Sequence, residues 1–212
     1  MNGRILLLAG SAEARRIAQT LQAQGMDVVA LVSEPPRGPD PMPVPCTLCR
    51  FDDPSALAWR MVGCDAVIDA SHGFDGMMSA TGHAAAHQAG VPFVSLARPV
   101  WPLDAANWHH AADVPAALAL IAPLLIFVLL TFIAHQGLFA FCCADKAHGA
   151  ADGADLAGDL LICRNLGGLP SRPKIDAARK LGLPVILIDR PAPPKGAQVV
   201  SSIEAVLAWV AD

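Results

Sequence analysis

Four loops of this 212-residue chain carry residues whose types and spacing could do chemistry. Each loop follows a short apolar run and combines small residues with hydroxyl, imidazole, amide or cationic side chains. Apolar runs that alternate with amphipathic helices predict a parallel sheet, so we expect all four loops at the carboxyl ends of strands. Open parallel sheets bind their ligands at that edge.

The first loop connects an apolar strand expected at Arg4–Ala9 to an amphipathic helix. Its residues are Gly10, Ser11, Ala12, Glu13, Ala14 and Arg15. Gly10 permits a tight turn, and the amides at the start of the helix favour an anion. Arg15 is placed to reach over the helix end, whereas Glu13 would repel a pyrophosphate if it pointed inward. The complete G-x-G-x-x-G fingerprint is absent, so an ordinary turn with Ser11 as N-cap remains the alternative.

The second loop, residues 34–38, follows the next expected strand. A dinucleotide site distinguishes a ribose hydroxyl from a 2′-phosphate at this position. Glu34 suits the hydroxyl, and Arg37 suits the phosphate. A solvated, proline-rich loop is the alternative.

The third loop contains Ser71, His72 and Phe74 after the strand expected at Ala66–Asp69. A Ser-His pair beside an aromatic ring can hold a ring and a carboxylate, or transfer a proton. The alternative is that Ser71 caps the next helix and that His72 is structural.

The fourth loop gives the strongest signal for an anion site. A strand end, two glycines, a polar helix cap and three cationic side chains converge there within a short segment. The residues are Arg164, Asn165, Gly167, Gly168, Ser171, Arg172 and Lys174. The glycines allow close backbone approach, and the cations attract an anion.

A duplicated pattern organises the chain into two alike parts. Gly-apolar-Pro begins a short apolar strand at Gly90 and again at Gly182, and the strands end in Arg98-Pro99 and Arg190-Pro191. Self-similarity at fixed offsets indicates a repeated structural unit. We therefore expect an α/β protein with two domains, residues 1–105 and 106–212, connected through Trp101–His110.

Composition narrows the function further. The chain is 54% hydrophobic and only 16% charged, and these fractions exclude a disordered chain. Its net charge is −4. No block of Lys and Arg suggests nucleic-acid binding. No secretion signal is recognised, so we expect reduced thiols and a cytoplasmic location. Cys46-x-x-Cys49 has zinc-like spacing but no second ligand pair, so we expect no metal.

One apolar stretch needs a separate interpretation. No charged residue lies between Asp113 and Asp145, and residues 124–133 are almost entirely apolar. Pro115, Pro123 and the polar residues that begin at His135 interrupt the stretch, which favours a buried strand and helix over a membrane span. We expect no membrane association, and a membrane-tethered interaction protein with a span at Leu118–Phe141 is the alternative.

Taken in order, the motifs resemble the precorrin-6A reductase family of cobalamin biosynthesis. The resemblance covers residues 3–108 and 159–212. It is carried by the segments 6–15, 69–74, 96–101, 165–178 and 188–191.

The resemblance implies two Rossmann-like domains with parallel sheets and a tetrapyrrole cleft between them. It implies NAD(P)H-dependent reduction of a carbon–carbon double bond in precorrin-6A or cobalt-precorrin-6A, with NADPH or NADH as cofactor. Independently of the resemblance, we expect a monomer. The implied cofactor-binding residues are Gly10, Ser11, Ala12, Glu13, Arg15 and Arg37. His72 is the catalytic candidate, and the implied substrate-binding residues are Ser71, His72, Phe74, Arg98, Arg164, Asn165, Gly167, Gly168, Ser171, Arg172, Lys174 and Arg190.

The chain departs from the family pattern in its second half. Residues 129–135 stand where family members have a Thr-Gly-Arg loop, and this stretch contains neither Gly nor Arg. A segment about as long as a strand, a helix and a strand is also missing between Phe141 and Asp159. A degenerate relative that binds a tetrapyrrole or a nucleotide without catalysis is therefore a further alternative.

Overall fold

The structure is a computed structural model, and it describes residues 3–35, 41–103, 105–121, 142–143, 160–168 and 172–212. Three expectations fall outside these residues. They concern the side chains of Arg37 and Ser171 and most of the apolar stretch that begins at Leu118.

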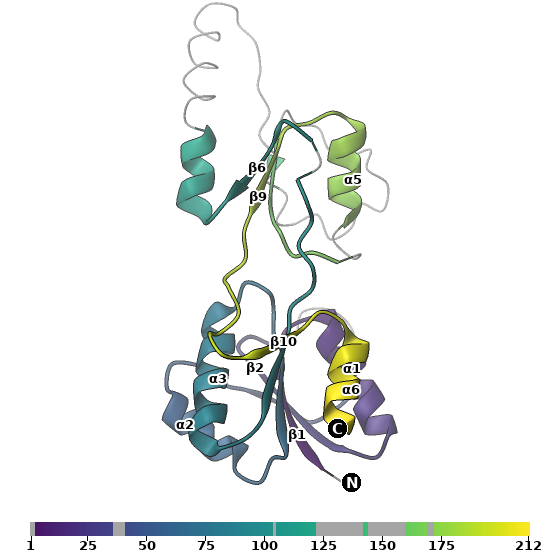
Figure 1. The fold of residues 1–212 in the computed structure, drawn as a ribbon, viewed down its shortest axis with the longest axis vertical. Coiled ribbons are helices and arrows are strands. Elements are labelled where there is room, and N and C mark those ends of the chain that lie inside the picture. Colours follow the sequence, from purple (N-terminus) through teal and green to yellow (C-terminus); the bar gives the residue numbers. More distant parts are fainter. Residues whose placement is uncertain (1–2, 36–40, 104, 122–141, 144–159, 169–171) are drawn as a thin grey trace, which may run out of the picture. The chain divides into compact units, whose positions relative to one another are not determined.

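Strands and helices alternate along the described chain (Figure 1). The elements are β1 (Arg4–Ala9), α1 (Ala12–Ala23), β2 (Asp27–Val32), β3 (Cys46–Leu48), α2 (Pro54–Met61), β4 (Ala66–Ala70), α3 (Gly76–Ala89), β5 (Phe93–Leu96), β6 (Trp108–Ala111), β7 (Cys142–Cys143), β8 (Leu161–Arg164), α5 (Arg172–Lys180), β9 (Val185–Ile188), β10 (Gln198–Val200) and α6 (Ile203–Ala211). Residues 114–121 are also helical.

The first sheet has the strand order β3-β2-β1-β4-β5-β10, and every neighbouring pair is parallel. In chain order this is the 3-2-1-4-5-6 arrangement of the Rossmann fold. The direction of winding reverses between β1 and β4, so the carboxyl ends of these two strands form the switch point. The predicted α/β class with parallel sheets is confirmed.

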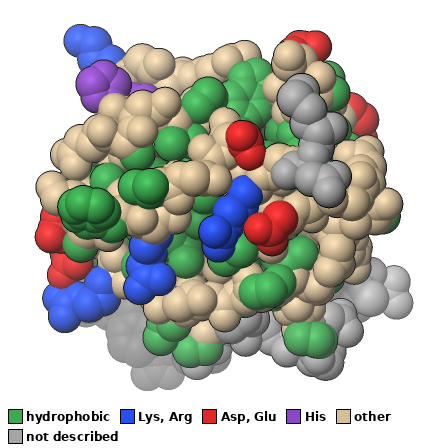
Figure 2. Space-filling model, turned by 90° about the horizontal axis from the view of Figure 1, so that it is seen from below, with side chains coloured by type: hydrophobic (Ala, Val, Ile, Leu, Met, Phe, Trp, Pro, Cys, Tyr) green, Lys and Arg blue, Asp and Glu red, His purple; other side chains and the backbone are tan. Residues whose placement is uncertain are grey.

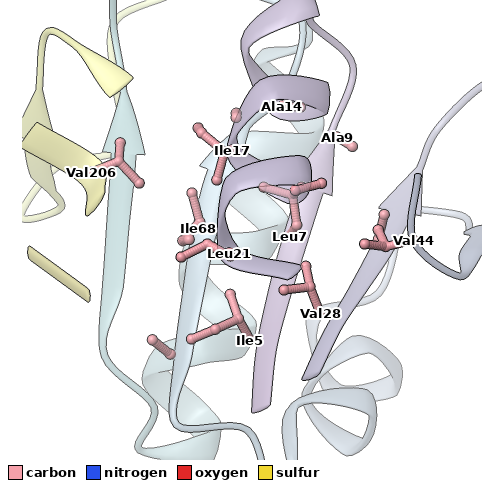
Figure 3. Close-up of a cluster of buried hydrophobic side chains, with 14 of the residues drawn as sticks. Ile5, Leu7, Ala9, Ala14, Ile17, Leu21, Val28, Val44, Ile68 and Val206 are labelled. Carbon is pink, nitrogen blue, oxygen red and sulfur yellow. The ribbon is translucent and has the colours of Figure 1, made fainter. Parts of the chain in front are cut away.

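Helices cover both faces of the first sheet. The α1 and α6 helices lie on one side of the strands and α2 and α3 on the other (Figure 1). Successive residues of β1 point to opposite faces of the sheet. Leu7 packs in the hydrophobic core beneath α1, and Leu8 packs in the core beneath α3. Figure 3 shows Ile17 and Leu21 of α1 among the strand side chains. Both are buried, as the helical spacing in the sequence predicts.

The chain divides into two compact units at its two Arg-Pro steps. Unit 1 comprises Met1–Arg98 and Pro191–Asp212, and unit 2 comprises Pro99–Arg190. The last segment belongs to unit 1 because β10 pairs with β5 and α6 packs against α1. This division differs from the expected domains of residues 1–105 and 106–212. The repeated Arg-Pro motif therefore stands at both chain crossings between the units.

The second sheet is smaller and is also parallel. Its strands are ordered β6-β9-β8-β7 in the described residues. Trp101, Trp108 and Ile175 are buried in its core. The expectation that Trp101–His110 is a domain connection is wrong, because this segment supplies two core tryptophans and most of β6.

A buried amide joins two segments of unit 2. The Asn165 side chain accepts a hydrogen bond from Trp101 N–H at 2.9 Å and donates one to Trp101 O at 3.1 Å. Asn165 is completely buried, and the Trp101 indole N–H donates to Gly168 O at 3.2 Å. The Asn165 amide thus satisfies the backbone N–H and C=O of Trp101, as a neighbouring strand would.

Charged side chains of both signs lie next to one another on the face shown in Figure 2. At the amino ends of the first sheet, Arg4 Nε lies 3.5 Å from Asp27 Oδ2, and Arg4 N–H donates to Asp65 Oδ2 at 2.7 Å.

None of the helices in the described part of the chain combines the length and apolar character that a membrane span requires.

We predict that Asn165→Ala destabilises the protein by about 2–3 kcal/mol, because two buried backbone groups of Trp101 lose their partners. Asn107→Ala is the matched control. The Asn107 side chain also donates to a backbone carbonyl, that of Gly182, but it is exposed. We expect the control to cost under about 1 kcal/mol. Urea unfolding measures both, and equal losses would contradict this role of Asn165.

Candidate functional site

Two loops pack directly against each other at the switch point of the first sheet. A Cβ atom on Gly10 would lie only 2.6 Å from His72 N, so only glycine fits at the end of β1. The Ser11 hydroxyl donates to Ala70 O at 2.8 Å and accepts from Ala14 N–H at 3.2 Å. Ser11 is therefore the predicted N-cap of α1, and it also ties the β1–α1 loop to the end of β4.

A buried carboxylate anchors the loop between β4 and α3. Asp69 is 2% exposed and accepts hydrogen bonds from Ser71 N–H at 3.1 Å and from the Ser95 hydroxyl at 2.9 Å. Ser71 Oγ also lies 3.1 Å from Ser79 Oγ in α3. These bonds fix the backbone at Ser71 and His72 relative to β4, β5 and α3.

The other end of the same loop is fixed by Asp75. Asp75 caps α3 by accepting from Met78 N–H at 3.0 Å, and it accepts from the Ser33 hydroxyl at 2.6 Å. Its backbone N–H donates to His72 O at 2.7 Å. Because Ser33 follows β2, the β4–α3 loop extends past the end of β1 to the end of β2.

The imidazole of His72 has a defined hydrogen-bonding state. Phe74 N–H donates to His72 Nδ1 at 3.3 Å, and the two rings are 6.3 Å apart. A neutral histidine whose Nδ1 accepts a hydrogen bond carries its proton on Nε2. His72 therefore presents an N–H donor on the other side of its ring.

The first turn of α1 contains an ion pair rather than an isolated acid. Arg98 Nη1 at the end of β5 donates to Glu13 Oε1 at 3.1 Å. The pair borders a polar cavity of about 170 Å³ that Ser201, Ser202 and Arg16 also line. Glu13 and Arg98, expected to contact cofactor and substrate respectively, are thus in contact with each other.

An apolar cavity of about 460 Å³ lies at the ends of β2 and β3. Val32, Met42, Val44 and Leu48 contribute to its walls. In a doubly wound sheet, the half of a dinucleotide beyond the pyrophosphate extends toward this strand pair. The apolar walls can accept a flat heterocyclic ring.

Unit 2 carries the residues of the fourth loop at the end of β8. Arg164 is exposed, and Gly167 and Gly168 have positive φ angles of 64° and 75°. Arg172 begins α5 and pairs with Asp176, with Nε 3.4 Å from Oδ1. Lys174 follows in the first turn, and Arg190 follows β9. The amide oxygen and nitrogen of Asn165, by contrast, each bond to the backbone of Trp101.

Four anchoring residues are not evident as such from the sequence: Asp69, Asp75, Ser33 and Ser95. Asp69 and Ser95 look like ordinary polar endings of two apolar strands. The one available signal was a carboxylate within an otherwise buried run, which needs a hydrogen-bonding partner to be stable. The Ser95–Asp69 and Ser33–Asp75 hydrogen bonds join residues 26 and 42 positions apart, and these pairings become visible only in the fold.

The Cys46-x-x-Cys49 pair lies at β3, and both thiols are free. Burial raises the pKa of the Cys46 thiol, which disfavours the thiolate that zinc requires. Within the described residues, no group of three or more metal-ligating side chains is found.

The fold and site together define a Rossmann-type α/β protein. A 3-2-1-4-5-6 parallel sheet leads through a glycine turn into a serine-capped helix at its switch point. Members of this class bind dinucleotides at that point.

Comparison with known proteins identifies the family. Residues 4–151 and 153–211 match the family described as Precorrin-6x reductase CbiJ/CobK. The chain belongs to this family. Precorrin-6A reductases from Rhodobacter capsulatus and Rhodococcus erythropolis are each 32% identical to it; the alignments cover 99% and 98% of this chain and 96% and 97% of those proteins. The solved structure of CobK precorrin-6A reductase matches with a TM-score of 0.76 and 29% identity, over 99% of this chain and 96% of that chain.

These matches confirm the resemblance found in the sequence, and they favour a reductase over the two alternatives. The alignment with the Rhodobacter capsulatus protein extends over 245 positions, although this chain has 212 residues. That relative therefore has segments without a counterpart here. The family match is interrupted at residue 152, inside the stretch expected to be shortened.

We predict that Asp69→Ala destabilises the protein by about 2–3 kcal/mol, since the buried Ser95 hydroxyl and the partly buried Ser71 N–H lose their acceptor. Asp69→Asn keeps an acceptor oxygen for Ser71 N–H and should cost less. The control is Asp52→Ala, which removes a surface contact with Arg50 and should cost about 0–1 kcal/mol. Urea unfolding tests the order, and a loss no larger for Asp69→Ala than for Asp52→Ala would refute the anchoring role.

Proposed function

We propose that this chain is a precorrin-6A reductase. It is an NAD(P)H-dependent oxidoreductase that reduces a carbon–carbon double bond of precorrin-6A, or of its cobalt form, to give precorrin-6B in cobalamin biosynthesis. The observation that carries this proposal is the family match over nearly the whole chain.

The switch point of unit 1 fits a dinucleotide. Gly10, Ser11 and Ala12 bring the backbone of the β1–α1 turn close to the ligand position, and the first-turn amides of α1 favour a pyrophosphate. Arg15 lies in the same turn. The apolar cavity at the end of β2 is proposed to hold the adenine ring. We propose NADPH as cofactor, with NADH as the alternative, because Arg37 suits a 2′-phosphate and Glu34 a ribose hydroxyl.

The reaction needs a hydride and a proton. A bound nicotinamide supplies the hydride to one carbon of the double bond. His72 is the residue proposed to hold a substrate carboxylate through the Nε2–H that the neutral ring carries, or, as the imidazolium, to give a proton to the other carbon and become neutral. Ser71 and Phe74 flank His72 in the anchored loop and are proposed to contact the macrocycle.

The substrate is a polycarboxylate, and unit 2 has cationic residues suited to it. Arg164, Arg172, Lys174 and Arg190 follow strand ends or begin α5, and guanidinium groups bind carboxylates in a bidentate manner. Gly167, Gly168 and Ser171 are proposed to bring the loop backbone near the substrate. We propose that Asn165 holds this loop in place through Trp101 rather than contacting the substrate.

We further propose a monomer in the cytoplasm. Cys46, Cys49 and Cys64 are free thiols in the structure, which suits a reducing compartment.

An anaerobic assay tests the proposed function. Purified protein should oxidise NADPH, measured by absorbance, only when precorrin-6A or its cobalt form is present. His72→Gln should lower kcat/KM about a hundredfold, while NADPH binding remains unchanged. The control is His87→Gln, on the exposed surface of α3. The absence of NADPH and NADH oxidation with both macrocycles would refute the proposal.

A second experiment addresses the cationic residues. Arg172→Ala combined with Lys174→Ala should raise KM for the macrocycle about tenfold or more and leave the Kd for NADPH unchanged, because charge-assisted contacts are lost on the substrate side only. Arg179→Ala combined with Lys180→Ala removes the same charge from the last turn of the same helix. An equal KM increase in this control would show that the effect is not local.

A further inference from the structure

The acidic residue in the first turn of α1 conflicts with the proposed cofactor site unless its charge is compensated. Glu13 lies in the turn whose amides would hold a pyrophosphate. A carboxylate there repels the phosphates and cancels part of the favourable helix-terminal potential. The inference below rests on the proposed function, because it concerns how that site accepts an anion.

The compensating charge comes from β5. The Glu13 and Arg98 side chains are only 16% and 19% exposed, and Oε1 and Nη1 are 3.1 Å apart. Partial burial limits solvent screening, so each charge reduces the other's field effectively. The second oxygen of Glu13, Oε2, is buried and has no hydrogen-bond donor among the described residues. In the described residues, Arg98 is thus the cation that the structure shows paired with the Glu13 carboxylate.

We propose that Arg98 favours dinucleotide binding indirectly, because it neutralises the charge of Glu13. Arg98 does not contact the dinucleotide itself. Arg98 is a positioning residue in this account. It holds the Glu13 carboxylate toward β5 and removes the net negative charge from the start of α1. This role differs from the substrate contact that the sequence suggested for Arg98. It also explains how an acidic residue is tolerated in an anion-binding turn.

The other charged side chains near the pair do not replace Arg98. Arg16 and Glu204 border the same cavity, and both are exposed. Interactions of Glu204 with its own backbone amide, with Ser202 and with Arg16 hold its pKa below the usual range. Glu204 is thus an anion that Arg16 faces, whereas Arg98 is bonded to Glu13.

A double-mutant cycle tests the proposal, with NADPH and NADH binding measured by fluorescence titration. Arg98→Ala should weaken NADPH binding about tenfold to a hundredfold by leaving the Glu13 charge uncompensated. Glu13→Gln should bind at least as tightly as the wild type. In the Glu13→Gln background, Arg98→Ala should change Kd by less than about twofold, because no charge remains to compensate.

Steady-state kinetics give a second readout that a folding defect would not mimic. Arg98→Ala should raise KM for NADPH and leave kcat at saturating NADPH unchanged. Arg16→Ala is the matched control, since it removes one positive charge from α1 without touching Glu13, and it should leave Kd unchanged. Thermal unfolding of each variant verifies folding. If Arg98→Ala alone fails to fold, the comparison of Glu13→Gln with the Glu13→Gln, Arg98→Ala double variant still tests whether Arg98 contacts the dinucleotide directly.

Two outcomes overturn the proposal in distinguishable ways. If Arg98→Ala weakens binding equally in both backgrounds, Arg98 contacts the dinucleotide directly and compensation is refuted. If it alters only the KM for the macrocycle, Arg98 binds substrate instead. Wild-type protein that binds neither NADPH nor NADH would refute the proposed function itself, and this role of Arg98 with it.

Discussion

The close contact between Gly10 and the backbone of His72 is the constraint on which the rest of the site depends. No Cβ fits between the ends of β1 and β4 at this point. The contact brings the start of α1 next to the β4–α3 loop, and the Ser11 hydroxyl links the two. The β1–α1 turn proposed to bind the anion and His72 are therefore held side by side at one edge of the parallel sheet.

Local charge matters more than net charge in this protein. A chain with a net charge of −4 is proposed to bind an anionic cofactor and a polycarboxylate substrate. The Glu13–Arg98 pair neutralises the start of α1, and the cationic residues of unit 2 gather around strand ends and the start of α5. Side chains placed by backbone geometry can thus create positive potential in a protein that is acidic overall.

The elements with strong periodicity were predictable from the sequence, and the connections among them were not. The burial of Ile17 and Leu21 follows from helical spacing, and β1 follows from an unbroken apolar run. The β6 strand was missed because His109 and His110 interrupt its apolar character, and β10 because three residues give too short a pattern. Short elements acquire their structure from pairing with distant strands, which sequence periodicity does not report.

The location of the candidate site at the strand ends was predictable from residue types. Which of its residues bond to other protein groups was not. Asn165 has the polarity of a ligand-binding residue, yet its amide oxygen accepts from Trp101 N–H and its amide nitrogen donates to Trp101 O. Arg98 looked like a free cation and is paired with Glu13. Such assignments depend on contacts between residues 64 and 85 positions apart. The repeated Arg-Pro motif was informative in another way, because it marks both crossings between the units.

The transfer of deuterium from the cofactor to the macrocycle would test whether this chain reduces precorrin-6A with a nicotinamide hydride. NADPH deuterated at C4 of the nicotinamide would be supplied anaerobically with precorrin-6A, and the product analysed by mass spectrometry and NMR. The account predicts that deuterium from one face of the nicotinamide appears on a single carbon of the reduced macrocycle. A reduced product without deuterium from either face, or no reduced product with NADPH or NADH, would contradict it.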